Sequence, residues 1–243
     1  MRAIHITSLK GPTAIEVVEV DEPTAGAESV VIDVHVAGVT FPEVLQSRGE
    51  YHLRRTLPFI PGAEIAGIVR SAPWDSGLTA GQRVAAFPGV GGYAETVAAP
   101  PTAVFPLPDN VSFHAGAALP MNYLTMHFGL VRRAQLKPGD TVLVHGAAGG
   151  VGTAAVQLAA ALDARVIAVV SEPGKVDTAK AAGADDVVLA DAFEDTVREL
   201  TGDGGVDIVV GGGGAGRGAR PPRAARPGGG PRARGAARGG GAG

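Results

Sequence analysis

The stretch TVLVHGAAGGVGTAAVQLAAAL, residues 141–162, constrains the fold more than any other part of the chain. Its beginning is a short apolar run that predicts a strand ending at His145, and its second half predicts a helix that begins near Val151. Between them, Ala147, Gly149 and Gly152 follow the spacing G-x-G-x-x-G, with alanine in first position. A strand, a glycine loop and a helix in this order are typical of a dinucleotide-binding fold.

Two positions of this loop require glycine for different physical reasons. Gly149 allows the backbone to approach a pyrophosphate, and Gly152 allows the helix to pack close to the strand. The helix N-terminus offers free N–H groups and the positive end of its dipole to a phosphate. The alternative is a glycine turn without a ligand. We predict a phosphate site formed by Ala148, Gly149, Gly150, Val151 and Gly152.

Strands and helices alternate after this loop. Apolar runs at 165–170, 186–189 and 206–210 predict strands, the last of them buried, and residues 174–182 and 193–201 predict helices between them. Continuous apolar strands that alternate with helices indicate a parallel sheet covered on both faces. The pattern therefore predicts an α/β fold with a partial Rossmann sheet, doubly wound and about four strands wide.

The second strand of this sheet ends without an acidic residue. An NAD site would place Asp or Glu there to bond the ribose 2′-OH, but Ser171 and Lys175 occupy the region. A hydroxyl and an ammonium group suit a 2′-phosphate, so the sequence favours NADPH as cofactor, although Glu172 is an unfavourable neighbour. The alternative is that Lys175 is only a solvated helix residue.

The first part of the chain reads as β-structure. Residues 30–36 alternate, with Val30, Ile32 and Val34 on one face, and further short runs are separated by Gly and Pro turns. Many short strands with such turns indicate a small barrel or a sandwich. A helical period begins near Ser112.

Charge and composition exclude several classes of function. Seven of the 21 basic residues but none of the 24 acidic residues lie in 211–243, so the rest of the chain is strongly acidic and a poor ligand for nucleic acid or anionic membranes. No apolar run is long enough to span a membrane, and the start resembles no secretion signal. The chain contains no cysteine, which excludes thiolate sites. We expect a cytoplasmic protein.

Several motifs in one order resemble the zinc-independent quinone oxidoreductases of the medium-chain dehydrogenase/reductase superfamily. They are VAGVTFPEVLQSRGEY, LPFIPGAEIAGIV, GGYAE, LPMNYLTMHF and VLVHGAAGGVGTAAVQLA. The resemblance implies a GroES-like β-barrel catalytic domain over residues 1–121 and a Rossmann NADP-binding domain over 122–210. It implies an NADPH-dependent reductase whose acceptor is a quinone or another α,β-unsaturated carbonyl compound (an enone). The sequence does not exclude enoyl thioesters as acceptors.

The resemblance also implies that the zinc site of related alcohol dehydrogenases is absent. Thr40 stands where those enzymes have a cysteine ligand, and Ala63 stands where they have a histidine. Neither side chain can replace a thiolate or an imidazole on zinc. Without a Lewis acid, hydride transfer suits an acceptor that is already electron-poor.

The remaining site residues are implied by the same resemblance. Tyr51 and Thr40 would lie near nicotinamide and substrate, with Tyr51 as a donor to the acceptor oxygen, and Asp191 would lie near the adenosine. Tyr51 could instead only pack at the barrel edge, and Thr40 could be a mere strand-end residue. The sequence leaves open whether the chain forms a homo-oligomer as members of this family do. The alternative functions are an NADPH-binding module without turnover and a nucleic-acid-binding arm.

That arm would be the last segment, residues 211–243, which contains only Gly, Ala, Arg and Pro. It has no aromatic side chain for base stacking, and its four residue types are those that a frameshift in GC-rich DNA produces. We expect a disordered tail that replaces the rest of the Rossmann sheet and impairs activity.

Overall fold

A computed structural model describes residues 1–24, 26 and 28–211 of the chain. The expectations for the Gly/Ala/Arg/Pro tail therefore lie outside the described residues, apart from Gly211. The chain divides into two compact units, Met1–Gln135 and Leu136–Gly243. The sequence prediction placed this boundary after residue 121. The division by contacts falls later, so that α3 (Pro120–His127), whose Met121 N–H donates to Glu64 Oε2 over 2.8 Å, belongs to the first unit.

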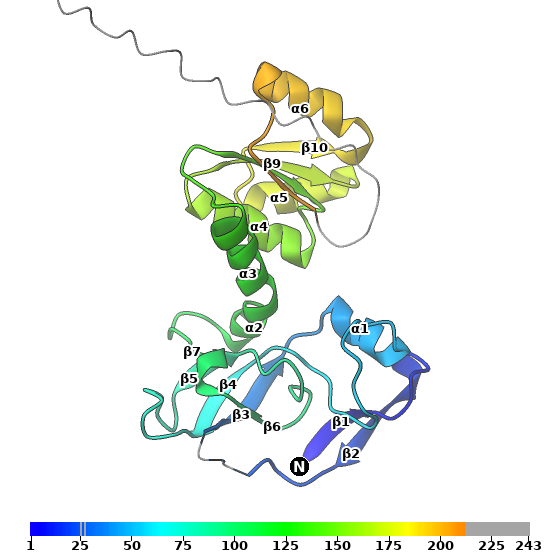
Figure 1. Cartoon of the computed structure of the whole chain (residues 1–243), viewed down its shortest axis with the longest axis vertical. Coiled ribbons are helices and arrows are strands. Elements are labelled where there is room, and N and C mark those ends of the chain that lie inside the picture. Colours follow the sequence, from blue (N-terminus) through cyan, green and yellow to red (C-terminus); the bar gives the residue numbers. More distant parts are fainter. Residues whose placement is uncertain (25, 27, 212–243) are drawn as a thin grey trace, which may run out of the picture. The chain divides into compact units, whose positions relative to one another are not determined.

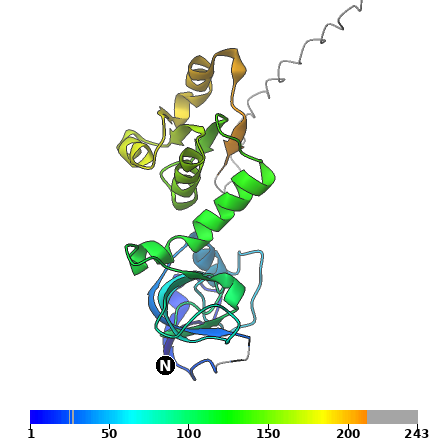
Figure 2. The same cartoon turned by 90° about the vertical axis from the view of Figure 1, so that its left-hand side faces the viewer.

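The first unit is built on a five-stranded antiparallel sheet with the order β6-β3-β4-β5-β7. The strands are β3 (Val30–Ala37), β4 (Ile65–Ser71), β5 (Arg83–Ala86), β6 (Thr96–Ala99) and β7 (Val104–Pro106). The sheet curls on itself, which Figure 2 shows nearly end-on. A separate ribbon of β1 (Arg2–Ile6) and β2 (Ile15–Glu19) is joined to it by single bridges, such as Ala3 to Ala94. This arrangement confirms the GroES-like first unit that the sequence predicted.

The core of the curled sheet comes from the alternating apolar side chains. Val30, Ile32, Ile65 and Val84 are fully buried. The register of β3 against β4 shifts twice, and such bulges bend a strand. Gly67 lies between the shifts, where a Cβ would stand 2.0 Å from the Asp33 carbonyl oxygen, so the two strands approach too closely for a side chain.

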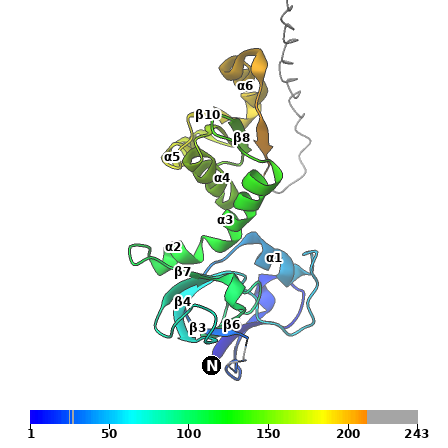
Figure 3. The same ribbon diagram turned by 60° about the vertical axis from the view of Figure 1, so that its left-hand side comes forward.

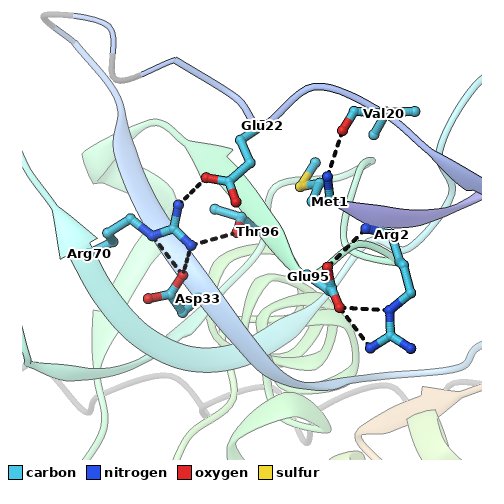
Figure 4. Close-up of polar contacts among 8 residues, drawn as sticks. All are labelled: Met1, Arg2, Val20, Glu22, Asp33, Arg70, Glu95 and Thr96. Carbon is cyan, nitrogen blue, oxygen red and sulfur yellow. Dashed lines mark hydrogen bonds and ion pairs between the residues drawn. The ribbon is translucent and has the colours of Figure 1, made fainter.

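Ion pairs on the surface connect the strands of this unit (Figure 4). The Arg70 guanidinium pairs with Asp33 and Glu22 and donates to Thr96 Oγ1 over 3.1 Å. Arg2 pairs with Glu95 over 2.7 Å. Exposed pairs of this kind contribute little because solvent screens them, so the buried apolar side chains determine the stability of the unit.

Helices of the first unit follow the sheet strands. α1 (Phe41–Arg48) comes directly after β3, and α2 (Phe113–Ala117) follows β7, with Ser112 Oγ accepting from the Ala115 N–H as its cap. α3 continues into a π-helical segment, η3 (Phe128–Arg133). Short 3₁₀ turns lie at η1 (Pro12–Ala14) and η2 (Pro101–Ala103).

The second unit is a parallel sheet with the order β10-β9-β8-β11. Its elements are β8 (Thr141–His145), α4 (Gly150–Ala161), β9 (Arg165–Val170), η4 (Pro173–Lys175), α5 (Val176–Ala181), β10 (Asp186–Leu189), η5 (Ala190–Ala192), α6 (Phe193–Thr201), η6 (Gly202–Gly204) and β11 (Ile208–Val210). The sheet order, numbered by position in the chain, is third, second, first and fourth, as for the first four strands of a Rossmann fold. α4 and α5 lie side by side on one face and α6 on the other (Figures 1 and 3).

The last strand differs from the sequence prediction. It begins at Ile208 instead of residue 206, and it is not buried, since Val209 is 45% exposed. The reason is its position, because β11 pairs with β8 alone among the described strands and stands at the sheet edge. In the part of the chain that the structure describes, no helix has the length and apolar character needed to cross a membrane.

Candidate functional site

The predicted phosphate loop lies between β8 and α4, at the carboxyl edge of the parallel sheet. β8 ends at His145, and α4 begins at Gly150 with Gly149 as its N-cap residue. No side chain among the described residues caps this helix. Its first N–H groups and the positive end of its dipole are therefore available to an anion.

Gly152 has the packing role that the sequence predicted. A Cβ at this position would lie 2.1 Å from the Gly146 carbonyl oxygen and 2.8 Å from Ala147 Cα, so only glycine allows this closeness of helix and loop. Gly149 is different, because the nearest atom to its Cβ would be Gly146 O at 3.4 Å. The protein itself leaves room at Gly149, and a ligand can approach the backbone there.

Ser171 and Lys175 lie together after the end of β9. The Lys175 ammonium donates to Ser171 Oγ over 2.9 Å and pairs with Glu172 Oε1 at 2.9 Å. Both charged side chains are about half exposed, at 46% for Lys175 and 61% for Glu172. The structure thus brings the two predicted residues together and shows that Lys175 already has a carboxylate partner.

Asp191 lies in η5, directly after β10, and it is exposed. The carboxyl ends of parallel strands share one edge, so Asp191, Ser171 and the glycine loop all lie along the same edge of the sheet. His145, at the end of β8, packs edge-on against Phe193 with ring centroids 4.8 Å apart. Burial lowers the pKa of His145, so its ring is neutral at physiological pH.

Thr40 belongs to the first unit and is the N-cap residue of α1. Its hydroxyl donates to Glu43 Oε2, and its backbone N–H donates to the same oxygen over 2.9 Å. This is a capping box, in which residues three apart satisfy the first N–H groups of a helix. Thr40 is therefore more than a strand-end residue, since it fixes where α1 begins.

Glu43 also bonds to Ala63, the second position at which the related alcohol dehydrogenases have a zinc ligand. Its Oε1 accepts from the Ala63 N–H over 3.2 Å, while its Oε2 is bonded to Thr40. The side chain is buried, with 7% exposed. One carboxylate thus connects the two positions. No group of three His, Cys, Asp or Glu side chains suited to a metal occurs within residues 1–24, 26 and 28–211.

The buried Glu64 and the half-buried Tyr93 adjoin Glu43, and none of these three residues was predicted from the sequence. Glu64 is 2% exposed, and burial raises the pKa of its carboxyl group, with a further contribution from the charge of Glu43. Burial also raises the pKa of Tyr93, whose hydroxyl donates to the Gly38 carbonyl oxygen over 3.0 Å. The spacing T-x-x-E at Thr40 was the available signal for Glu43.

Tyr51 lies just beyond the other end of α1. The helix ends at Gly49, which has a left-handed φ of 70°, and Tyr51 is half-buried beside His52, with ring centroids 4.3 Å apart. A helix of eight residues is about 12 Å long. Thr40 and Tyr51 therefore mark opposite ends of α1 and do not form one contact pair, whereas the predicted cofactor residues all belong to the second unit.

Comparisons with known proteins match both units. The family model "Alcohol dehydrogenase GroES-like domain" matches residues 26–109, and "Zinc-binding dehydrogenase" matches residues 150–229. The quinone oxidoreductase-like protein 2 of Bos taurus is 37% identical over 213 residues, which are 86% of this chain and 60% of that protein. The chain thus spans about three fifths of the length of this curated relative.

Solved structures are similar over the same range. A probable oxidoreductase from Mycobacterium abscessus is 48% identical with a TM-score of 0.81, over 86% of this chain and 67% of that one. The quinone oxidoreductase of Thermus thermophilus, whose structure includes a complex with NADPH, is 38% identical with a TM-score of 0.76, over 86% of this chain and 65% of that one.

Proposed function

The chain belongs to the quinone-oxidoreductase-like members of the medium-chain dehydrogenase/reductase family, and from this membership we propose that it transfers a hydride from NADPH to a quinone or enone acceptor. The observation that carries the proposal is the uncapped N-terminus of α4 behind a glycine loop. This cradle fits a pyrophosphate, because its N–H groups are free and Gly149 leaves the backbone open.

The choice of NADPH is supported by the end of β9. Ser171 and Lys175 offer a hydroxyl and an ammonium group where the 2′-phosphate of the adenosine ribose would bind. We assign the Asp191 carboxylate, which follows β10, as a hydrogen-bond acceptor for the adenosine. The structure of the Thermus thermophilus relative in complex with NADPH supports the choice of cofactor.

When bound, the cofactor supplies the hydride. Thr40 and Ala63 provide no metal ligand, so the acceptor must be electron-poor before it binds. We assign the Tyr51 hydroxyl as donor to the acceptor oxygen, so that the acceptor gains one hydride and one proton in total. Thr40 is bonded to Glu43 and holds the start of α1, which makes it a positioning residue.

The test is NADPH oxidation by the purified chain with a panel of quinones and enones. We expect turnover that a metal chelator leaves unchanged and that Tyr51→Phe lowers in kcat more than in KM. The control is Tyr123→Phe, a tyrosine on α3 of the same unit. NADPH binding with no turnover on any acceptor would instead identify the chain as a binding module.

A further inference from the structure

A cavity of about 240 Å³ lies at the C-terminal end of α1, beside Tyr51. It is smaller than the 300–1,000 Å³ typical of sites for drug-sized ligands, so it suits a single ring or a short chain. Phe59 and Leu53 form an apolar part of its wall together with the Tyr51 ring. The aromatic and aliphatic side chains favour a ligand with a flat or apolar body.

Gln46 is one of the residues that line the same cavity, and its carbonyl oxygen Oε1 lacks a hydrogen-bond partner. Gln46 is only 8% exposed, and its Oε1 is fully buried without a hydrogen-bond donor among the described residues. An unsatisfied buried polar atom costs about 1–3 kcal/mol. Only a hydrogen-bond donor from outside the described residues would satisfy this oxygen.

Three arginines surround the cavity, and none of them has a carboxylate partner in the described part of the chain. They are Arg48, Arg54 and Arg55. By contrast, Arg2, Arg70 and Arg83 of the same unit all pair with carboxylates. Arg48 lies in the last turn of α1, where the helix dipole favours a cation. That reason does not apply to Arg54 and Arg55, which follow the helix.

We propose that this cavity binds the anionic group of the acceptor, so that the preferred substrates are small enones or quinones that carry a carboxylate or phosphate. The arginines attract the anion, and the ring or chain lies against Tyr51 and Phe59. The identity of the substrate class rests on the proposed reductase function, whereas the anion site itself does not.

The first experiment measures binding without turnover. The full chain is titrated by calorimetry with p-toluate, p-tolyl phosphate and the neutral analogue p-toluamide at low and high salt. We expect at least one anion to bind about tenfold more tightly than the amide, and salt to reduce that preference. The tighter of the two anions identifies the acid group. Equal binding of all three compounds would overturn the proposal.

Variants locate the site. The exposed pair Arg54→Gln/Arg55→Gln should abolish the preference for the anion, whereas Arg132→Gln is the control because that exposed arginine does not line this cavity. If the Arg54/Arg55 variant retains the preference, the anion binds elsewhere and the assignment is wrong. Circular dichroism verifies that each variant is folded.

The second experiment measures the rate with benzoylacrylate and its neutral amide as acceptors. One hydride and one proton add across the carbon–carbon double bond and yield benzoylpropionate and NADP⁺. The Arg54→Gln/Arg55→Gln variant should raise KM about tenfold for the acid, but not for the amide or NADPH. A higher KM for NADPH would overturn the proposal. Anion binding without turnover of either acceptor would refute the reductase function and leave the anion site standing.

Discussion

Replacing Lys175 should reduce the preference of this chain for NADPH over NADH, and replacing Glu172 should strengthen it. In the free protein the Lys175 ammonium is shared between Ser171 Oγ and Glu172 Oε1, each at 2.9 Å. A bound 2′-phosphate would replace Ser171 and Glu172 as the partner of this ammonium. Lys175→Ala removes the cation, so we expect NADPH to bind more weakly while NADH, which carries a 2′-hydroxyl, is little affected.

The expected change in the Kd of NADPH follows from two competing interactions of Lys175. A hydrogen bond to a charged group contributes about 1.5–3 kcal/mol, and an exposed ion pair such as that of Lys175 with Glu172 contributes about 0.2–1 kcal/mol. The net loss in Lys175→Ala is therefore at the lower end of the first range, or about tenfold in the Kd of NADPH. Glu172→Gln frees the ammonium and removes a like charge, so NADPH should bind about 1.5- to 5-fold more tightly.

The assay is titration of each variant with NADPH and NADH, followed by cofactor fluorescence at two salt concentrations. The matched control is Lys180→Ala, an exposed lysine in the last turn of α5. The reasoning is refuted if Lys175→Ala weakens NADH as much as NADPH, or if Lys180→Ala has the same effect as Lys175→Ala. Weaker NADPH binding in Glu172→Gln would contradict the assigned role of the carboxylate.

Other changes test the rest of the site. Gly152→Ala places a Cβ 2.1 Å from a backbone oxygen and should cost at least about 1–3 kcal/mol in stability and abolish NADPH binding, as thermal unfolding and titration will show. Glu43→Ala removes the capping box of α1 and should lower the unfolding free energy by about 0.5–2 kcal/mol or more in urea. Burial raises the pKa of Glu64 in the folded chain, so the protonated form favours folding. This stabilisation is lost as the pH rises from the ordinary pKa near 4.3 through the raised pKa. The native chain should therefore lose stability between acidic and neutral pH relative to the Glu64→Gln variant. Metal analysis of the purified chain should find no stoichiometric zinc, and one tightly bound zinc per chain would contradict that expectation.

The second unit was predictable because its signals are local. Residues 141–189 contain continuous apolar strands and a glycine loop, and the strands and α4 lie within one residue of the predicted bounds. β11 was predicted too long and too buried, because the exposure of Val209 depends on which strands lie beside it. The sequence run VDIVV contains no information about that neighbour.

The first unit was predicted less completely. The helix α1 was missed, although T-x-x-E at Thr40 and the glycine at position 49 are its start and stop signals. The strand β7 is only three residues long and ends at Pro106, which weakens any strand pattern. The cluster of Glu43, Glu64 and Tyr93 joins segments far apart in the chain, so no local pattern predicts it.

The bonds of Glu43 have a consequence for how such a fold can change over evolutionary time. They reach residues 40 and 63 largely through main-chain N–H groups, which every residue except proline possesses. A substitution at position 63 other than proline keeps the N–H that bonds to Glu43, and one at position 40 removes the hydroxyl's part of the capping box but keeps the main-chain bond. The backbone geometry at residues 40 and 63 therefore depends little on which side chains stand at these two positions. A lineage can exchange ligand side chains at these two positions, and with them its chemistry, on an unchanged scaffold.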